Sequence, residues 1–94
     1  MRARSNELWT FWMGGAYPRG YPSGFERRLM RRLQMLNAAH ELRDLTIPPG
    51  NRLEALRGDL LGHWSIRVNQ QYRLVFQWDD TNKEAYDAYF DDYH

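Results

Sequence analysis

The sequence predicts an α+β domain in which two N-terminal helices pack on a small, antiparallel-rich sheet of three to four strands. Two patterns indicate this class. Before residue 40, apolar residues recur every three or four positions, as in amphipathic helices. After residue 50 they recur at every second position, with many β-branched and aromatic residues, as in half-buried strands. A chain of 94 residues holds one modest core, so we expect residues 1–94 to form a single domain.

The first helix is expected over Asn6 to Met13. Leu8 and Trp12 stand four residues apart, and neighbouring aromatic residues widen the apolar arc. Gly14, with a second glycine after it, ends the helix. We interpret the aromatic cluster as core rather than as a platform for stacking bases.

The second helix is expected to begin at a capping box made by Ser23 and Glu26 and to end near Ala39. Its apolar residues fall within an arc of roughly 80°, which must face the sheet. These residues are Phe25, Leu29, Leu33 and Leu36.

Two alternating segments, 64–68 and 72–78, predict a hairpin closed by the short polar break at Asn69. A third strand is expected over 51–56, started by Pro48-Pro49-Gly50. A fourth should place Tyr86, Ala88 and Phe90 on one face. The connector 40–45 has room for one helical turn, and residues 1–4 are expected to be frayed.

Composition excludes several classes of site. There is no cysteine, so disulfides and zinc–thiolate sites are excluded, and a reducing cytoplasm is permitted. The histidines at 40, 63 and 94 are scattered, and the late acidic residues lack metal-ligand spacing. We therefore expect no metal and no cofactor. We also expect no membrane segment, because no apolar run approaches the length of a span.

Charge is distributed unevenly along the chain. Residues 1–73 carry 12 Arg and 6 acidic residues, whereas residues 74–94 carry one Lys and 6 acidic residues. The arginine guanidinium can bind phosphate through two N–H groups, so the excess of arginine suits contact with RNA. Intramolecular ion pairs would explain the excess equally well. Four arginines of the second helix form a candidate RNA- or ribosome-binding face, the alternative being a solvated surface; they are Arg27, Arg28, Arg31 and Arg32.

The segment IPPGNRLEALRGDLLGHWSIRVNQQYRLVFQW and the closing DDYH resemble HigB, the host-inhibition toxin of the RelE/ParE superfamily. The resemblance covers about residues 25–94, with several motifs in the right order. Members usually begin with an extra edge strand, which we expect here to be absent or reduced to a few residues. The resemblance implies the RelE/ParE-like fold and a ribosome-dependent endoribonuclease of a type II toxin–antitoxin system.

The resemblance also implies the site. HigB toxins end in DYH, so Asp92, Tyr93 and His94 carry over directly, with His94 as the proton-transfer group. Asp92 would orient His94 or contact the ribose, and Tyr93 would stack on a base or hydrogen-bond the phosphate. Arg57 stands where many HigB proteins have lysine; it can stabilise phosphate charge but cannot transfer a proton at neutral pH.

Arg73 is expected to point away from the apolar face of its strand, where it could clamp the scissile phosphate. A salt bridge to Asp87 or Asp91 is the alternative. Arg67, one strand over, is a weaker candidate for RNA binding.

By resemblance, the expected reaction is metal-independent attack of the ribose 2′-OH on the adjacent phosphate of mRNA in the ribosomal A site. The expected partners are the ribosome, mRNA and a HigA-like helix-turn-helix antitoxin, in the cytoplasm. A non-catalytic module of the same fold remains an alternative, either a gyrase inhibitor of the ParE type or a decayed toxin.

Overall fold

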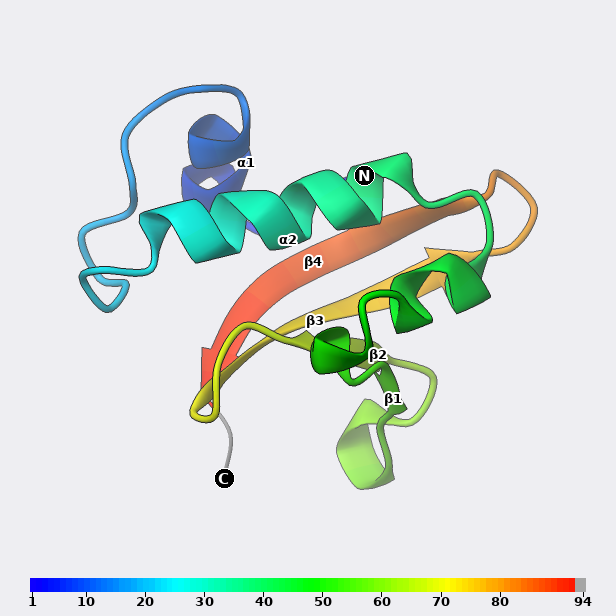
Figure 1. Ribbon diagram of the computed structural model, residues 1–94. Helices are drawn as coiled ribbons and strands as arrows, with labels where there is room; N and C mark the ends of the chain where they lie inside the picture. Colours follow the sequence, from blue (N-terminus) through cyan, green and yellow to red (C-terminus); the bar gives the residue numbers. More distant parts are fainter. Residues whose placement is uncertain (93–94) are drawn as a thin grey trace.

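A computed structural model describes residues 1–92 and consists of two layers, with helices on one face of an antiparallel sheet (Figure 1). The helices are α1 (Asn6–Trp12) and α2 (Glu26–Ala38). The sheet has the order β1-β2-β3-β4. Its strands are β1 (Glu54–Ala55), β2 (Trp64–Arg67), β3 (Tyr72–Asp79) and β4 (Glu84–Asp92). The predicted α+β class, with two N-terminal helices and up to four strands, is therefore confirmed.

The core lies between α2 and the sheet, and α1 adds Leu8 and Phe11 to it. The predicted apolar stripe of α2 faces this core, with Leu29 and Leu33 fully buried and Phe25 half-buried at its edge. The sheet contributes buried side chains from β2, β3 and β4: Ile66, Leu74, Phe76, Ala85 and Ala88. One face of the sheet is thus covered by helices, which leaves the other face to carry a site.

The capping box predicted at Ser23 is wrong, because α2 begins at Glu26 with Phe25 as its N-cap. Gly24 adopts a φ of +90°, so the chain turns just before the helix. The Phe25 ring packs edge-on against Tyr72 of β3, with centroids 5.4 Å apart. This tertiary contact sets where the helix begins, in place of a local side-chain cap.

The predicted hairpin is confirmed: β2 and β3 are antiparallel, with Trp64 opposite Phe76 and Arg67 opposite Arg73. Asn69 closes the turn, since its side-chain oxygen accepts hydrogen bonds from the backbone N–H groups of Gln71 and Tyr72. Asparagine commonly bonds its own turn backbone in this way, so no glycine is needed.

The third strand is shorter than predicted, because only Glu54 and Ala55 pair with β2. Residues 49–51 form instead a 3-10 turn, η2 (Pro49–Asn51), which ends at Arg52 with a φ of +46°. The Asn51 side chain is fully buried and donates to the carbonyls of Leu45 and Ile47. Extended backbone at 51–52 is therefore replaced by a turn that this buried amide stabilises. The predicted connector turn is present as η1 (Leu42–Thr46).

A β-bulge interrupts β4 and corrects the predicted position of Tyr86. Val75 pairs with Tyr89, and Gln77 pairs with Tyr86. Phe76 of β3 therefore lies opposite two residues of β4, Asp87 and Ala88. Asp87 adopts a φ of +54°. An extra residue reverses the alternation on one side of a bulge. Tyr86 therefore lies on the face away from the helices, where its hydroxyl donates to Gln77 Oε1.

The N-terminal segment is ordered, so the predicted fraying of residues 1–4 is wrong. Ala3 forms a parallel bridge with Ala88, and the backbone N–H groups of Arg2 and Arg4 donate to β4 carbonyls. The expected reduction of the first edge strand to a few residues is confirmed. Within residues 1–92 no helix combines the length and apolar character needed to cross a membrane.

Candidate functional site

The sheet face opposite the helices carries a row of charged side chains in register. Arg67 of β2 lies directly opposite Arg73 of β3, and Arg73 lies opposite Asp91 of β4. Residues opposite one another in antiparallel strands project on the same side, so the three side chains are neighbours. Arg73 thus points away from the apolar core, as predicted. Two guanidinium groups side by side make this part of the face attractive to an anion.

Arg73 forms an ion pair with Asp91, which was the alternative to a phosphate clamp, and its Nη2 lies 3.3 Å from Asp91 Oδ2. Its side chain is only 15% exposed, so its charge is held in a partly desolvated position. Asp87, the other predicted partner, instead accepts two hydrogen bonds from Arg4, at 2.9 and 2.8 Å. That pairing, helped by Gln77, lowers the pKa of Asp87.

A small pocket opens beside Arg73 and brings in Arg57. Its lining comes from β1, from β3 and from the turn η3 (Gly58–Leu60): Glu54, Ala55, Leu56, Arg57, Leu60 and Arg73. Gly58, with a φ of +64°, turns the chain just after Arg57, and Leu56 is buried beneath. The pocket therefore combines two guanidinium groups with one carboxylate, although Arg57 and Arg73 are 16 residues apart in sequence.

Glu54 is a site residue that the sequence analysis did not single out. It pairs with Ser65, which is opposite Val75, so it projects on the same face as Arg73. Its only signal in the sequence is its place three residues before Arg57, in a segment too short to show alternation. A carboxylate beside two arginines can accept a proton from a hydroxyl group, which neither arginine can do.

The four predicted arginines of α2 line one shallow groove together with Val68. Arg27, Arg28 and Arg31 are exposed, and no salt bridge to any of the four is found within residues 1–92. Arg32 is half-buried, and its Nε donates to the carbonyl of Arg67 at 2.9 Å. Burial, with repulsion from Arg31 and Arg28, lowers the pKa of Arg32. Arg32 therefore also holds α2 on the end of β2.

The start of α2, which carries the groove arginines, and the end of β4 lie at the same end of the molecule (Figure 1). The start of α2 contacts Tyr72 through Phe25, and Tyr72 is the pairing partner of Asp92. Asp92 is half-buried at the end of β4. The predictions for Tyr93 and His94 fall outside the described residues.

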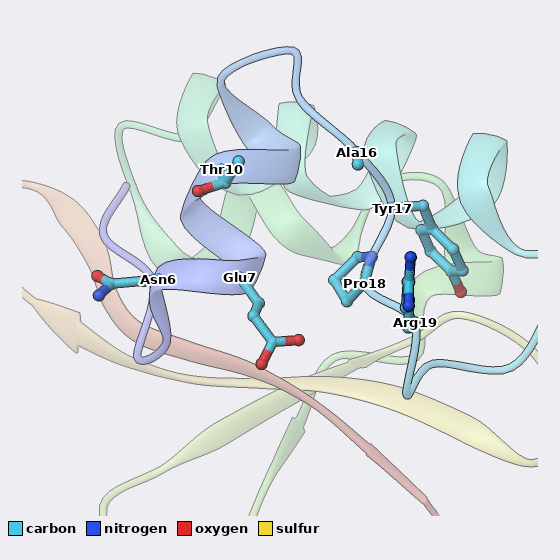
Figure 2. Close-up of a pocket in the computed structure, with 7 residues that line it drawn as sticks. All are labelled: Asn6, Glu7, Thr10, Ala16, Tyr17, Pro18 and Arg19. Atoms are coloured by element: carbon cyan, nitrogen blue, oxygen red, sulfur yellow. The ribbon is translucent and has the colours of Figure 1, made fainter.

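Another pocket is separate from this site. The pocket lies beside α1 and is lined by none of the predicted site residues; it involves Asn6, Glu7, Thr10, Ala16, Tyr17, Pro18 and Arg19 (Figure 2). Among residues 1–92, no group of three or more histidine, cysteine, aspartate or glutamate side chains is arranged to hold a metal ion.

Two helices covering one face of a four-stranded antiparallel sheet form the arrangement of the RelE/ParE-like fold. The YoeB/ParE toxin from Agrobacterium tumefaciens shares this fold, with a TM-score of 0.51 and 20% identity over 97% of this chain and 99% of that one. The family model described as RelE-like toxin of type II toxin-antitoxin system HigB matches residues 2–94. The chain belongs to this HigB family.

Two relatives are similar over shorter stretches. Toxin HigB-1 of Vibrio cholerae is 59% identical over 59 residues, which are 63% of this chain and 62% of that protein. Endoribonuclease HigB of Proteus vulgaris is 36% identical over 75 residues, 80% of this chain and 78% of that protein. The match to the first relative thus spans less than two thirds of its length.

Proposed function

We propose that this protein is the toxin of a type II toxin–antitoxin system and cleaves mRNA in the ribosomal A site. The observation that carries the proposal is the pocket shared by Arg57, Arg73 and Glu54 on the sheet face opposite the helices. Membership of the HigB family and the name Endoribonuclease HigB of the Proteus relative support the same class of reaction.

The proposed reaction is a transesterification within the RNA strand. Glu54 or Asp92 accepts the proton of the ribose 2′-OH, whose oxygen then attacks the adjacent phosphorus. The bond from phosphorus to the 5′-oxygen breaks, and that oxygen takes a proton from His94, which leaves a 2′,3′-cyclic phosphate. Arg73 and Arg57 neutralise the charge that develops on the phosphate, a role that guanidinium groups fill without a metal ion. Tyr93 stacks on a base beside the phosphate.

The α2 groove supplies the docking surface in this proposal. Arg27, Arg28 and Arg31 present charge that no carboxylate within residues 1–92 neutralises, as contact with ribosomal RNA requires. Arg67 extends the positive charge toward the pocket. The partners are the ribosome, mRNA and a HigA-like helix-turn-helix antitoxin, and translation places the activity in the cytoplasm.

The test is cleavage by the purified chain of one labelled mRNA, free and bound to programmed ribosomes, beside the His94→Ala variant. We expect cuts in the A-site codon only with ribosomes, ends that carry a cyclic phosphate, and no cuts by His94→Ala. Circular dichroism checks that the variant folds. Equal cleavage of free RNA would contradict ribosome dependence, and full activity of a folded His94→Ala protein would remove His94 from the mechanism. No cleavage by wild type would favour a non-catalytic toxin of the same fold.

A further inference from the structure

A chain of aromatic contacts links the loop between the helices to the last residues of β4. Tyr21 packs against Phe90 with ring centroids 5.2 Å apart, and Phe90 packs against Tyr72 of β3 at the same spacing. The Phe90 ring therefore lies against one ring from the loop and one from the neighbouring strand.

The loop that carries Tyr21 is itself anchored. Tyr17 packs edge-on against Phe11 of α1 and against Tyr21, and its hydroxyl donates to the carbonyl of Pro22 at 2.6 Å. Burial raises the pKa of Tyr17 to about 12, in keeping with a neutral hydroxyl held within the fold. The loop runs beside α1 with Tyr17 next to Pro18 (Figure 2). The contacts of Tyr17 therefore hold Tyr21 in place against Phe90.

The end of β4 needs this support because its outer edge is poorly paired. Within the described residues, the backbone hydrogen bonds from the N-terminal segment reach Ala85 and Ala88 and go no further. Beyond Ala88, β4 pairs with β3 on one side only. Strand ends held on a single side open most readily, so side-chain packing there has an unusually large effect on position.

Phe90 stands two residues before Asp92 and four before His94. We propose that Tyr21 is a positioning residue, which through Phe90 holds the end of β4, the strand that leads into Asp92, Tyr93 and His94. This inference rests on the proposed function, in which those residues take part in RNA cleavage. It gives the loop 14–25 a role in activity without any contact between the loop and RNA.

The variants separate ring packing from other roles of Tyr21. Tyr21→Ala removes the ring, Tyr21→Phe keeps the ring without the hydroxyl, and Tyr21→Leu keeps apolar volume without a ring, in case the alanine variant fails to fold. Trp9→Ala is the matched control, because Trp9 is an aromatic residue of α1 that is 41% exposed and takes no part in the ring contacts among residues 1–92. Urea midpoints show which variants remain folded.

Kinetics on programmed ribosomes give the first readout. We expect kcat of Tyr21→Ala to fall by about tenfold to a hundredfold, because small displacements of reacting groups are this costly, while KM changes by less than about twofold. Tyr21→Phe should restore kcat, and Trp9→Ala should match wild type. An unchanged kcat in folded Tyr21→Ala and Tyr21→Leu proteins would overturn the proposal, as would equal loss in Tyr21→Phe.

The second readout is independent of cleavage. In ¹H–¹³C NMR spectra of the full chain, we expect Tyr21→Ala to move or broaden the imidazole signals of His94, assigned by His94→Ala, and to leave those of His40 unchanged. Unmoved His94 signals would overturn the positioning role. This measurement stands even if wild type cleaves no RNA, so failure of the proposed function and failure of this inference are distinguishable.

Discussion

Arg73 combines two properties that its position explains. It lies near the start of the inner strand β3, between β2 and β4, so its long side chain is mostly covered by its neighbours. Arg73 nevertheless lines the pocket beside Arg57. Asp91, directly opposite, supplies a counter-charge at 3.3 Å. A guanidinium has five N–H donors, so one arginine can serve a carboxylate and a phosphate oxygen together.

We predict that Arg73→Ala lowers kcat for mRNA cleavage on ribosomes by about 10²–10³-fold, the usual loss when one stabiliser of transition-state charge is removed. Asp91→Asn is the matched control, since it removes the ion pair and keeps the Arg73 charge, and it should retain far more activity. Single-turnover cleavage and circular dichroism are the measurements. Equal losses in two folded variants would show that the ion pair, rather than a phosphate contact, is what matters.

At the scale of elements, the two faces of α2 have different roles. Its leucine face makes the core, and its arginine face makes a groove with Val68 at the end of the β2–β3 hairpin. Arg27 and Arg31 lie outward, where their charges repel each other slightly. Replacing them therefore alters the surface charge and leaves the buried contacts of the helix intact.

We predict that the double variant Arg27→Glu/Arg31→Glu binds 70S ribosomes more weakly and with a flatter salt dependence. The slope of log K against log salt is negative. Removal of one arginine–phosphate interaction should reduce its magnitude by about 0.7–0.9, because fewer counterions are released. Arg43→Glu, on the exposed connector η1, should have a smaller effect. The measurement is the binding of wild type, the double variant and Arg43→Glu to 70S ribosomes across a series of salt concentrations. A slope equal to that of wild type would make this helix face a solvated surface only.

At the scale of the whole molecule, the N-terminal segment is joined to the last strand by an ion pair. Arg4 donates twice to Asp87, and its guanidinium lies 3.8 Å from the centre of the Tyr89 ring. The pair with Arg4 lowers the pKa of Asp87 below the ordinary value, which is about 3.9. Its stabilising effect is therefore present above about pH 4 and disappears as the pH falls through the lower folded-state pKa.

We predict that Asp87→Asn is less stable than wild type near pH 6 and that the two converge at about pH 2–3, below the ordinary pKa of aspartate. Asp80→Asn removes the same charge from an exposed hairpin position and should change the pH dependence less. Urea denaturation at a series of pH values measures both. Parallel stability curves for wild type and Asp87→Asn would contradict the role given to the Arg4–Asp87 pair.

Much of the fold could be predicted because its main elements have local signatures. The leucine spacing of α2 and the alternation through Trp64 and Tyr72 each lie within about ten residues, the range over which periodicity is informative. The start of α2, the length of β1 and the bulge at Asp87 escaped prediction. Two of these involve residues far apart in sequence, Phe25 with Tyr72 and Asp87 with Arg4. The third involves the burial of the Asn51 amide against the carbonyls of residues 45 and 47, which residue periodicity does not show.

The candidate site divides in the same way. The resemblance to HigB pointed to Arg57, Arg73 and the terminal residues, and alternation along β3 predicted the face on which Arg73 lies. Glu54 escaped notice because β1 has only two residues, so no alternation could show the face on which its carboxylate projects. The choice of Asp91 over Asp87 as partner of Arg73 depended on the register of β3 with β4, which places Asp91 directly opposite Arg73.

The sequence by itself determined the α+β class, the buried face of α2, the central hairpin and the family, since these follow from residue spacing and from motifs contiguous in the chain. Only the tertiary structure decided that Glu54 joins Arg57 and Arg73, that Tyr86 lies on the outer face, and that Tyr21 supports Phe90. The physical reason is distance along the chain. Strand register, bulges and ring packing join residues that lie tens of positions apart, and no local pattern records which of the available partners will meet.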